Sequence, residues 1–217
     1  MKILIVSATK FEINPLIETL GMPKIISNHL SRFQTKQHQV DILITGIGMV
    51  FTTFYLSTIL AKENYDYAVN AGVAGAIDKD LLLGEIVHVT NDYFYELGAE
   101  NGEEWLKVED LNLLTENDLP YTSGGLTNNK IPDLATIKAL KQVKGQTVNK
   151  VHGHALSIKT MKSRTPMFFT PLLLRAFRFS GECGYRLLAR QIKPQPAAIR
   201  PKPNSGQWCW CPTTNAR

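Results

Sequence analysis

A short apolar strand that runs directly into a loop of very small residues constrains this chain more than any other stretch. Tyr67, Ala68 and Val69 are apolar, and the small-residue loop that follows (residues 71–76) carries almost no side-chain bulk. Small residues after a buried parallel strand allow a ligand to contact the backbone, and open α/β sheets bind ligands at such strand ends. The alternative is a tight turn that lets a helix pack closely on the sheet. On this stretch alone, both interpretations stand.

Strands and helices alternate along the first third of the chain. Near-continuous apolar runs predict buried strands over Lys2–Ser7, Val40–Thr45 and Asp66–Asn70. Helices are expected between them, over about residues 9–20 and from Gly48 to about Lys62. This alternation predicts an α/β fold with three layers, in which a mainly parallel or mixed twisted sheet is flanked by helices.

The remainder of the chain has a less regular pattern. It predicts two short strands within residues 24–39, a strand over 84–90, a helix over 132–143 and a further strand over 146–153 with a loop at its end. The acidic, glycine-broken segment 91–105 is expected to form an excursion at the sheet edge or an oligomer contact.

Charge is distributed unevenly along the chain. Residues 1–154 contain 13 Lys and Arg against 18 Asp and Glu, whereas residues 155–217 contain 11 against one, Glu182. Seven of the 11 prolines and all three cysteines also lie in the second part. We therefore predict an α/β domain over residues 1–154, incomplete at its C-terminal end, followed by a basic, proline-rich segment over 155–217 whose pattern predicts no defined fold.

Several classes of protein are disfavoured by the pattern. No apolar run approaches the ~20 residues of a membrane span, and the N-terminal run is too short for a secretory signal, so a cytoplasmic location is expected. The basic tail carries Trp208 and Trp210 but no repeated arginine/aromatic pattern, which does not favour nucleic acid as a partner. His152 and His154 lack a third ligand, so neither a metal nor another cofactor is predicted.

Candidate ligand groups follow four of the predicted strands, at residues 7–12, 46–48, 72–75 and 152–153. Glu12 completes a Thr-x-x-Glu capping box, so it could cap the helix or act as general base on a water. Gly-x-Gly at 46–48 lacks the third glycine of a dinucleotide fingerprint. The only Lys or Arg residues in these loops are Lys10 and Lys150, which favours a neutral or sugar-like ligand over a polyphosphate.

Four segments in this order resemble the nucleoside phosphorylase and nucleosidase superfamily: Ala8–Glu12, Thr45–Gly48, Asn70–Ala76 and Gly84–Val87. Within it, residues 87–102 and 147–153 look like futalosine hydrolase. That family hydrolyses the N-ribosidic bond of futalosine to hypoxanthine and dehypoxanthine futalosine in menaquinone biosynthesis. The sister activity is that of methylthioadenosine/adenosylhomocysteine nucleosidase. The resemblance covers about residues 1–153.

The resemblance implies a role for each matching residue. Glu12 would polarise the attacking water. The ribose and water pocket would be lined by Gly46, Ile47, Gly48, Val73, Ala74 and Gly75, and the base would be flanked by Val151 and His152. Because the transition state is oxocarbenium-like, a proton donor to the leaving purine and a ribose-holding carboxylate are expected as well. The family tendency implies a homo-oligomer, and the absence of a loop arginine favours hydrolysis over phosphorolysis.

The family pattern stops near His154. Beyond it the family has a Met-Glu segment that binds the ribose hydroxyls, and Arg-x-Ile-Ser followed by Asp or Asn at the purine, and this sequence contains neither. Codons for the family's x-Phe-Tyr-Ala stretch, read one base out of frame, can give the Phe-Phe-Thr-Pro found at 168–171. We therefore hypothesise a change of reading frame between about residues 154 and 165 that leaves the chain inactive or a ligand-binding remnant. A divergent end that still folds is the alternative.

Overall fold

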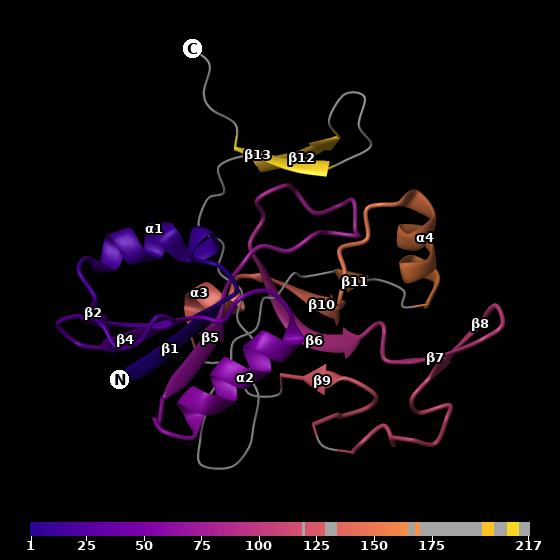
Figure 1. Ribbon diagram of the computed structural model, residues 1–217, viewed down its shortest axis with the longest axis horizontal. Helices are drawn as coiled ribbons and strands as arrows, with labels where there is room; N and C mark the ends of the chain where they lie inside the picture. The colour runs from indigo at the N-terminus through magenta and orange to yellow at the C-terminus, as the bar shows by residue number, and fades with distance from the viewer. Residues whose placement is uncertain (119, 129–133, 165–167, 170–196, 202–207, 213–217) are drawn as a thin grey trace.

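The computed structural model describes residues 1–118, 120–128, 134–164, 168–169, 197–201 and 208–212 (Figure 1). The N-terminal elements are β1 (Lys2–Ser7), α1 (Lys10–Leu20), β2 (Lys24–Ile25), β3 (Leu30–Gln34), β4 (Gln39–Ile44), α2 (Met49–Leu60) and β5 (Tyr67–Asn70). They are followed by β6 (Val87–Phe94), β7 (Gly98–Asn101), β8 (Glu104–Lys107), β9 (Leu126–Thr127), α3 (Ala135–Lys138) and β10 (Lys141–Thr147). The last are α4 (Ala155–Arg164), β11 (Phe168–Phe169), β12 (Ala197–Pro201) and β13 (Trp208–Pro212).

The N-terminal sheet has the strand order β2-β3-β4-β1-β5. β1 pairs in parallel with β4 and β5, whereas β3 is antiparallel to β4. Ser7 pairs with Ile44 and Val6 with Asn70, so β4, β1 and β5 end at the same level. The predicted mixed sheet flanked by helices is confirmed, as are the two short strands expected within residues 24–39.

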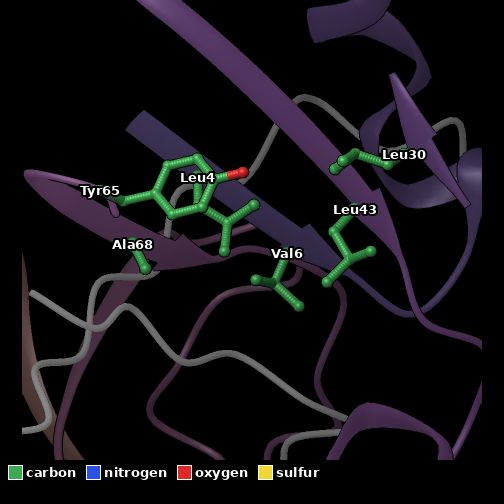
Figure 2. Packing of buried hydrophobic residues seen from close by; sticks show 6 residues of the cluster. All are labelled: Leu4, Val6, Leu30, Leu43, Tyr65 and Ala68. Atoms are coloured by element: carbon green, nitrogen blue, oxygen red, sulfur yellow. The ribbon is translucent and has the colours of Figure 1, made fainter. Parts of the chain in front are cut away.

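Helices α1 and α2 cover opposite faces of this sheet (Figure 1). On the α2 face, six buried side chains form one cluster, shown in Figure 2: Leu4, Val6, Leu30, Leu43, Tyr65 and Ala68. On the α1 face, Ile13 packs with Phe33, Val40 and Ile42. Full burial of an aliphatic or aromatic side chain stabilises a fold by about 1.5–3 kcal/mol. Because both faces are covered, the central strands are largely apolar, and this made them recognisable in the sequence.

A charged network surrounds the buried Asp41 and joins β1, β3 and β4. Asp41 of β4 is fully buried and accepts two hydrogen bonds from the Arg32 guanidinium, at 2.8 and 2.7 Å. The hydroxyl of Tyr65 donates to the same carboxylate at 2.7 Å. Glu63 contacts both Arg32 and Lys2. Burial, and then the hydrogen bond to Asp41, raise the pKa of Tyr65 well above its usual range.

A second sheet has the order β11-β10-β6-β9. β10 is parallel to both β6 and β11, and β9 is antiparallel to β6. The register between β6 and β10 shifts at Val143/Lys144, which is a β-bulge or irregularity in the ladder. Thr147 pairs with Phe94, so β6 and β10 also end together.

Two predictions for the middle of the chain were wrong. The segment 91–105 is not wholly an excursion, because β6 continues to Phe94 and buries Asp92; only the β7–β8 hairpin fits the expectation. The helix predicted over 132–143 is reduced within the described residues to α3, and residues 141–147 form β10. In residues 141–143, where the predicted helix and the observed strand overlap, parallel pairing with β6 overrode the local helix propensity of Lys141 and Gln142.

The basic segment is described in part. Residues 155–164 form α4, and β12 pairs with β13 as an antiparallel hairpin. Glu182, Cys183 and most of the remaining tail lie outside the described residues. Within the part of the chain that the structure describes, none of the helices has the length and apolar character needed to cross a membrane.

Candidate active site

Three loops meet where β4, β1 and β5 end, because the backbone ladder continues past the strands. The Thr45 amide donates to the Ser7 carbonyl at 2.9 Å, and the Ala71 amide donates to the Val6 carbonyl at 2.8 Å. These bonds hold the loops after the three strands side by side at one edge of the sheet. This is the edge where parallel α/β sheets bind ligands.

Glu12 lies in the first turn of α1 and contacts two of these loops. Its Oε2 accepts hydrogen bonds from the Thr9 amide at 2.8 Å and the Thr9 hydroxyl at 2.9 Å, while the Glu12 amide donates back to that hydroxyl at 3.4 Å. The predicted capping box is therefore present. Glu12 Oε1 accepts from the Val73 amide at 3.1 Å. The carboxylate thus caps α1 and also joins the helix to the small-residue loop.

These contacts hold the Glu12 carboxylate at the sheet edge without burying it completely. The side chain is half-buried, and the Ser7 hydroxyl lies 3.5 Å from Oε2. The amino end of a helix favours negative charge, and an ionised carboxylate offers about four acceptor sites. A carboxylate held in this way can accept a proton from a water that approaches from the loop side.

The small-residue loop divides its residues between packing and exposure. Ala71 and Gly72 are buried, and Ala74 packs against the core beneath α1. Val73 is 41% exposed and Gly75 is also exposed. The packing interpretation therefore holds for Ala71, Gly72 and Ala74, and the ligand-binding role of Val73 and Gly75 stays a prediction.

The glycines after β4 set the entry into α2. Gly46 and Gly48 have φ values of +84° and +102°, where a side chain would strain the backbone, and Gly48 is the N-cap of α2. Ile47 between them is 60% exposed. This geometry leaves the Ile47 side chain free at the same sheet edge as Glu12.

The predicted base-flanking residues belong to the second sheet. Val151 is 65% exposed, whereas the His152 side chain is 8% exposed and its Nε2 lies 3.2 Å from Glu96 Oε1. The His152 ring also meets the Tyr95 ring edge-on, with centroids 5.7 Å apart. The structure thus groups Glu12 with residues 46–48 and 73–75, and it groups His152 with Glu96.

A hollow of about 200 Å³ adjoins this second group. It is lined by Met49, Phe94, Glu96, Leu97, Thr147 and Asn149. Met49 directly follows Gly48, whereas the other lining residues lie at or just beyond the ends of β6 and β10. The hollow therefore brings the start of α2 together with the ends of both strands of the second sheet. Its walls are mainly apolar, with Glu96 as the one ionisable side chain among them.

Sequence reasoning missed Glu96 and Asn70. Glu96 was assigned to an edge excursion, although a carboxylate two residues after a strand that ends beside Thr147 is a signal of a ligand-facing group. Asn70 ends β5 and is fully buried, and neither atom of its side-chain amide has a hydrogen-bond partner in the part of the chain described. No three potential metal-binding side chains cluster among the described residues.

A sequence comparison places this chain in a known family. A family model described as the phosphorylase superfamily matches residues 2–150. The chain belongs to the phosphorylase superfamily. This confirms the resemblance inferred from the glycine-containing loops and their order.

Individual relatives match a smaller part of this chain than the family model does. An aminodeoxyfutalosine nucleosidase of Campylobacter jejuni is 31% identical over 100 residues, which are 45% of this chain and 44% of that protein. A 5'-methylthioadenosine/S-adenosylhomocysteine nucleosidase of Maridesulfovibrio salexigens is 31% identical over 104 residues, 46% of this chain and 44% of that protein. The matched part thus spans less than half the length of either relative.

Solved structures share the fold over a longer part of the chain. The futalosine hydrolase mutant of Helicobacter pylori has a TM-score of 0.60 at 14% identity, covering 79% of this chain and 78% of that one. The 5'-methylthioadenosine/S-adenosylhomocysteine nucleosidase of Streptococcus pneumoniae has a TM-score of 0.62 at 17% identity, covering 79% and 75%. At these identities the likeness concerns the fold, and it agrees with the predicted nucleoside phosphorylase-like architecture.

Proposed function

We propose that this chain is built for hydrolysis of the N-ribosidic bond of a purine nucleoside. The observation that carries the proposal is Glu12, a carboxylate held at the carboxyl edge of the sheet by Thr9 and by the amide of Val73. Both matched relatives are named nucleosidases, which supports the same reaction class.

In the proposed reaction, Glu12 accepts a proton from a water as the water attacks the anomeric carbon. Positive charge develops on the ribose while the bond to the purine breaks, so a nearby carboxylate also lowers the barrier electrostatically. The exposed part of the small-residue loop and residues 46–48 line the ribose and water pocket in this proposal. Lys10 and Lys150, the cations of these loops, are exposed, which favours water over phosphate as the nucleophile.

The proposed substrate is futalosine, with release of hypoxanthine and dehypoxanthine futalosine in menaquinone biosynthesis. The two segments that look like futalosine hydrolase, residues 87–102 and 147–153, become neighbours in the structure through the pairing of β6 with β10. His152 and Glu96, which come from these two segments, are in contact. Methylthioadenosine/adenosylhomocysteine nucleosidase is the alternative activity, because the second matched relative carries that name at equal identity.

We further propose that the chain as written has only a low residual turnover. The family's ribose-binding Glu and its purine-side Asp or Asn are missing from residues 155–217. Each lost group of this kind lowers the rate on the order of 10²–10⁴-fold. The alternative is a non-catalytic remnant that binds a ligand on the same scaffold.

Self-association is also proposed, through α2. Eight of its twelve residues are apolar, yet none of its residues is buried: Val50, Phe51 and Phe54 are 80%, 57% and 63% exposed. A surface of this kind is typical of an interface. A second copy is the proposed occupant, in line with the homo-oligomer that the family resemblance implies.

Hydrolysis assays with the purified full chain test the function. Futalosine, methylthioadenosine and inosine are supplied separately, and release of the free base is followed by chromatography. Glu12→Gln should lower turnover on the order of 10²–10⁴-fold, and Glu18→Gln, which changes an exposed carboxylate on the same helix, is the matched control. Base release that is unchanged in Glu12→Gln would refute the proposed role of this residue. Turnover close to that of an efficient enzyme would refute the proposed loss of activity.

A further inference from the structure

Glu96 is the ionisable side chain on the wall of the hollow, and its position follows from the second sheet. β6 ends at Phe94 beside Thr147, so the chain beyond both strands meets at one place. There the Asn149 amide donates to Glu96 Oε2 at 2.6 Å. The bond ties the end of β6 to the loop that follows β10, and it orients the carboxylate.

The second oxygen of this carboxylate holds a histidine. Glu96 Oε1 lies 3.2 Å from His152 Nε2, and the His152 side chain is 8% exposed against 22% for Glu96. The Tyr95 ring packs edge-on against the imidazole. A carboxylate that is hydrogen-bonded to one imidazole nitrogen fixes the orientation of the ring, and the two groups can share a proton.

The remaining walls of the hollow suit a flat aromatic ligand. Phe94 offers an aromatic ring, Met49 a polarisable side chain and Leu97 an aliphatic one. Mainly apolar walls with a few fixed polar groups are typical of small-molecule sites. A purine base stacked there would have Glu96 as its charged neighbour.

We propose that Glu96 is the proton donor to the leaving purine in this chain, with His152 as its positioning partner. This inference rests on the proposed function. As the bond between the anomeric carbon and the base nitrogen breaks, its electron pair passes to the base, and the proton shared by Glu96 and His152 moves to a base nitrogen. Water adds to the anomeric carbon and gives its proton to Glu12. The products are free purine and the ribose hemiacetal, and solvent exchange returns the proton from Glu12 to the Glu96–His152 pair.

The test compares two leaving groups in the full-length protein. A purine nucleoside needs a proton on its leaving group, whereas 4-nitrophenyl β-D-ribofuranoside releases a stable phenolate without one. Glu96→Gln keeps the size of the side chain and one acceptor oxygen for the Asn149 amide, and it places an NH₂ group at His152, but it cannot transfer a proton. It should lower kcat with inosine or futalosine on the order of 10²–10⁴-fold and leave kcat with the nitrophenyl riboside within about threefold. Glu12→Gln should lower kcat with both substrates.

His152→Gln should lower kcat with the purine nucleoside less than Glu96→Gln does, and it should again leave kcat with the nitrophenyl riboside unchanged. It should also change the pH dependence of kcat for the purine nucleoside alone. Glu103→Gln, at the exposed turn between β7 and β8, is the matched control and should change neither substrate. Equal losses with both substrates in Glu96→Gln, or no loss with either, would overturn the proposal while leaving the proposed function intact. Wild-type turnover of the nitrophenyl riboside without turnover of any purine nucleoside would also overturn it. No wild-type turnover of either substrate would overturn the proposed function, and the role of Glu96 with it.

Discussion

The two roles of Glu12, helix cap and water activator, can be separated by comparing Thr9→Ala with Glu12→Gln. Thr9→Ala removes the hydroxyl that accepts from the Glu12 amide at 3.4 Å and donates to Glu12 Oε2 at 2.9 Å. Loss of such a cap costs about 1 kcal/mol, within a range of about 0.5–2 kcal/mol. The Thr9 amide, at 2.8 Å, and the Val73 amide, at 3.1 Å, still hold the carboxylate.

Glu12→Gln has a similar cost in stability for a different reason. A glutamine has one acceptor oxygen and one NH₂ group, so the NH₂ must face either the amide of Thr9 or the amide of Val73. One of these hydrogen bonds is therefore lost, which costs about 1 kcal/mol. For a chain of this size, both variants should lower Tm by about 2–4 °C.

The variants should differ in catalysis. Glu12→Gln removes the general base and should lower kcat on the order of 10²–10⁴-fold, which is about 2.7–5.5 kcal/mol of barrier. Thr9→Ala leaves the base in place and should lower kcat less than about tenfold. Thermal unfolding gives the stability change, and base release from a purine nucleoside gives kcat. Equal kcat losses in two variants of equal Tm would refute the separation and reduce Glu12 to a cap.

Four further outcomes are expected. Asp41→Ala leaves Arg32 and the Tyr65 hydroxyl without their acceptor, and should lower the free energy of unfolding by about 3–5 kcal/mol in urea titrations; a loss below about 1 kcal/mol would contradict the network. The pKa of Tyr65 is raised in the folded state, so its hydroxyl stabilises the fold fully below about pH 10, the ordinary pKa of tyrosine, and this stabilisation is lost as the pH rises from there towards the folded-state pKa. Tyr65→Phe should therefore flatten the decline of the free energy of unfolding at alkaline pH. Phe54→Glu should shift the protein towards monomer in light scattering, with the exposed Thr53→Glu of the same helix as control; equal masses would remove α2 from the interface. Sequencing of the coding DNA should show, in another frame after about codon 154, the Met-Glu and Arg-x-Ile-Ser segments; their absence from every frame would refute the frame change.

Sequence reasoning succeeded where each strand is buried on both faces. Residues 2–7 and 40–45 are largely apolar because α1 and α2 cover both sides, and their loops were placed at one edge from order alone. It failed at residues 141–143, which were predicted as the end of a helix. In β10, Lys141, Gln142 and Lys144 are exposed while Val143, Gly145 and Gln146 are buried, without regular alternation, and the strand exists through its pairing with β6. Such pairing joins residues more than fifty positions apart and leaves no local signal.

The candidate site divides in the same way. Glu12 could be named in advance because a capping box and a strand end are both local patterns. Glu96 could not be named in advance, because its candidate role depends on contacts with His152 and with the Asn149 amide, which both follow another strand, β10.

By itself, the sequence determined the α/β class, the superfamily, the position of Glu12 and the change of character near residue 154. These follow from periodicity, from capping chemistry and from the order of small-residue loops, all of which act over a few residues. Only the tertiary structure decided that the small-residue loop donates its Val73 amide to Glu12, and that β6 and β10 bring Glu96 to His152 beside a hollow. Contacts of this kind arise from the register of strands distant in the chain, which short-range sequence patterns do not encode.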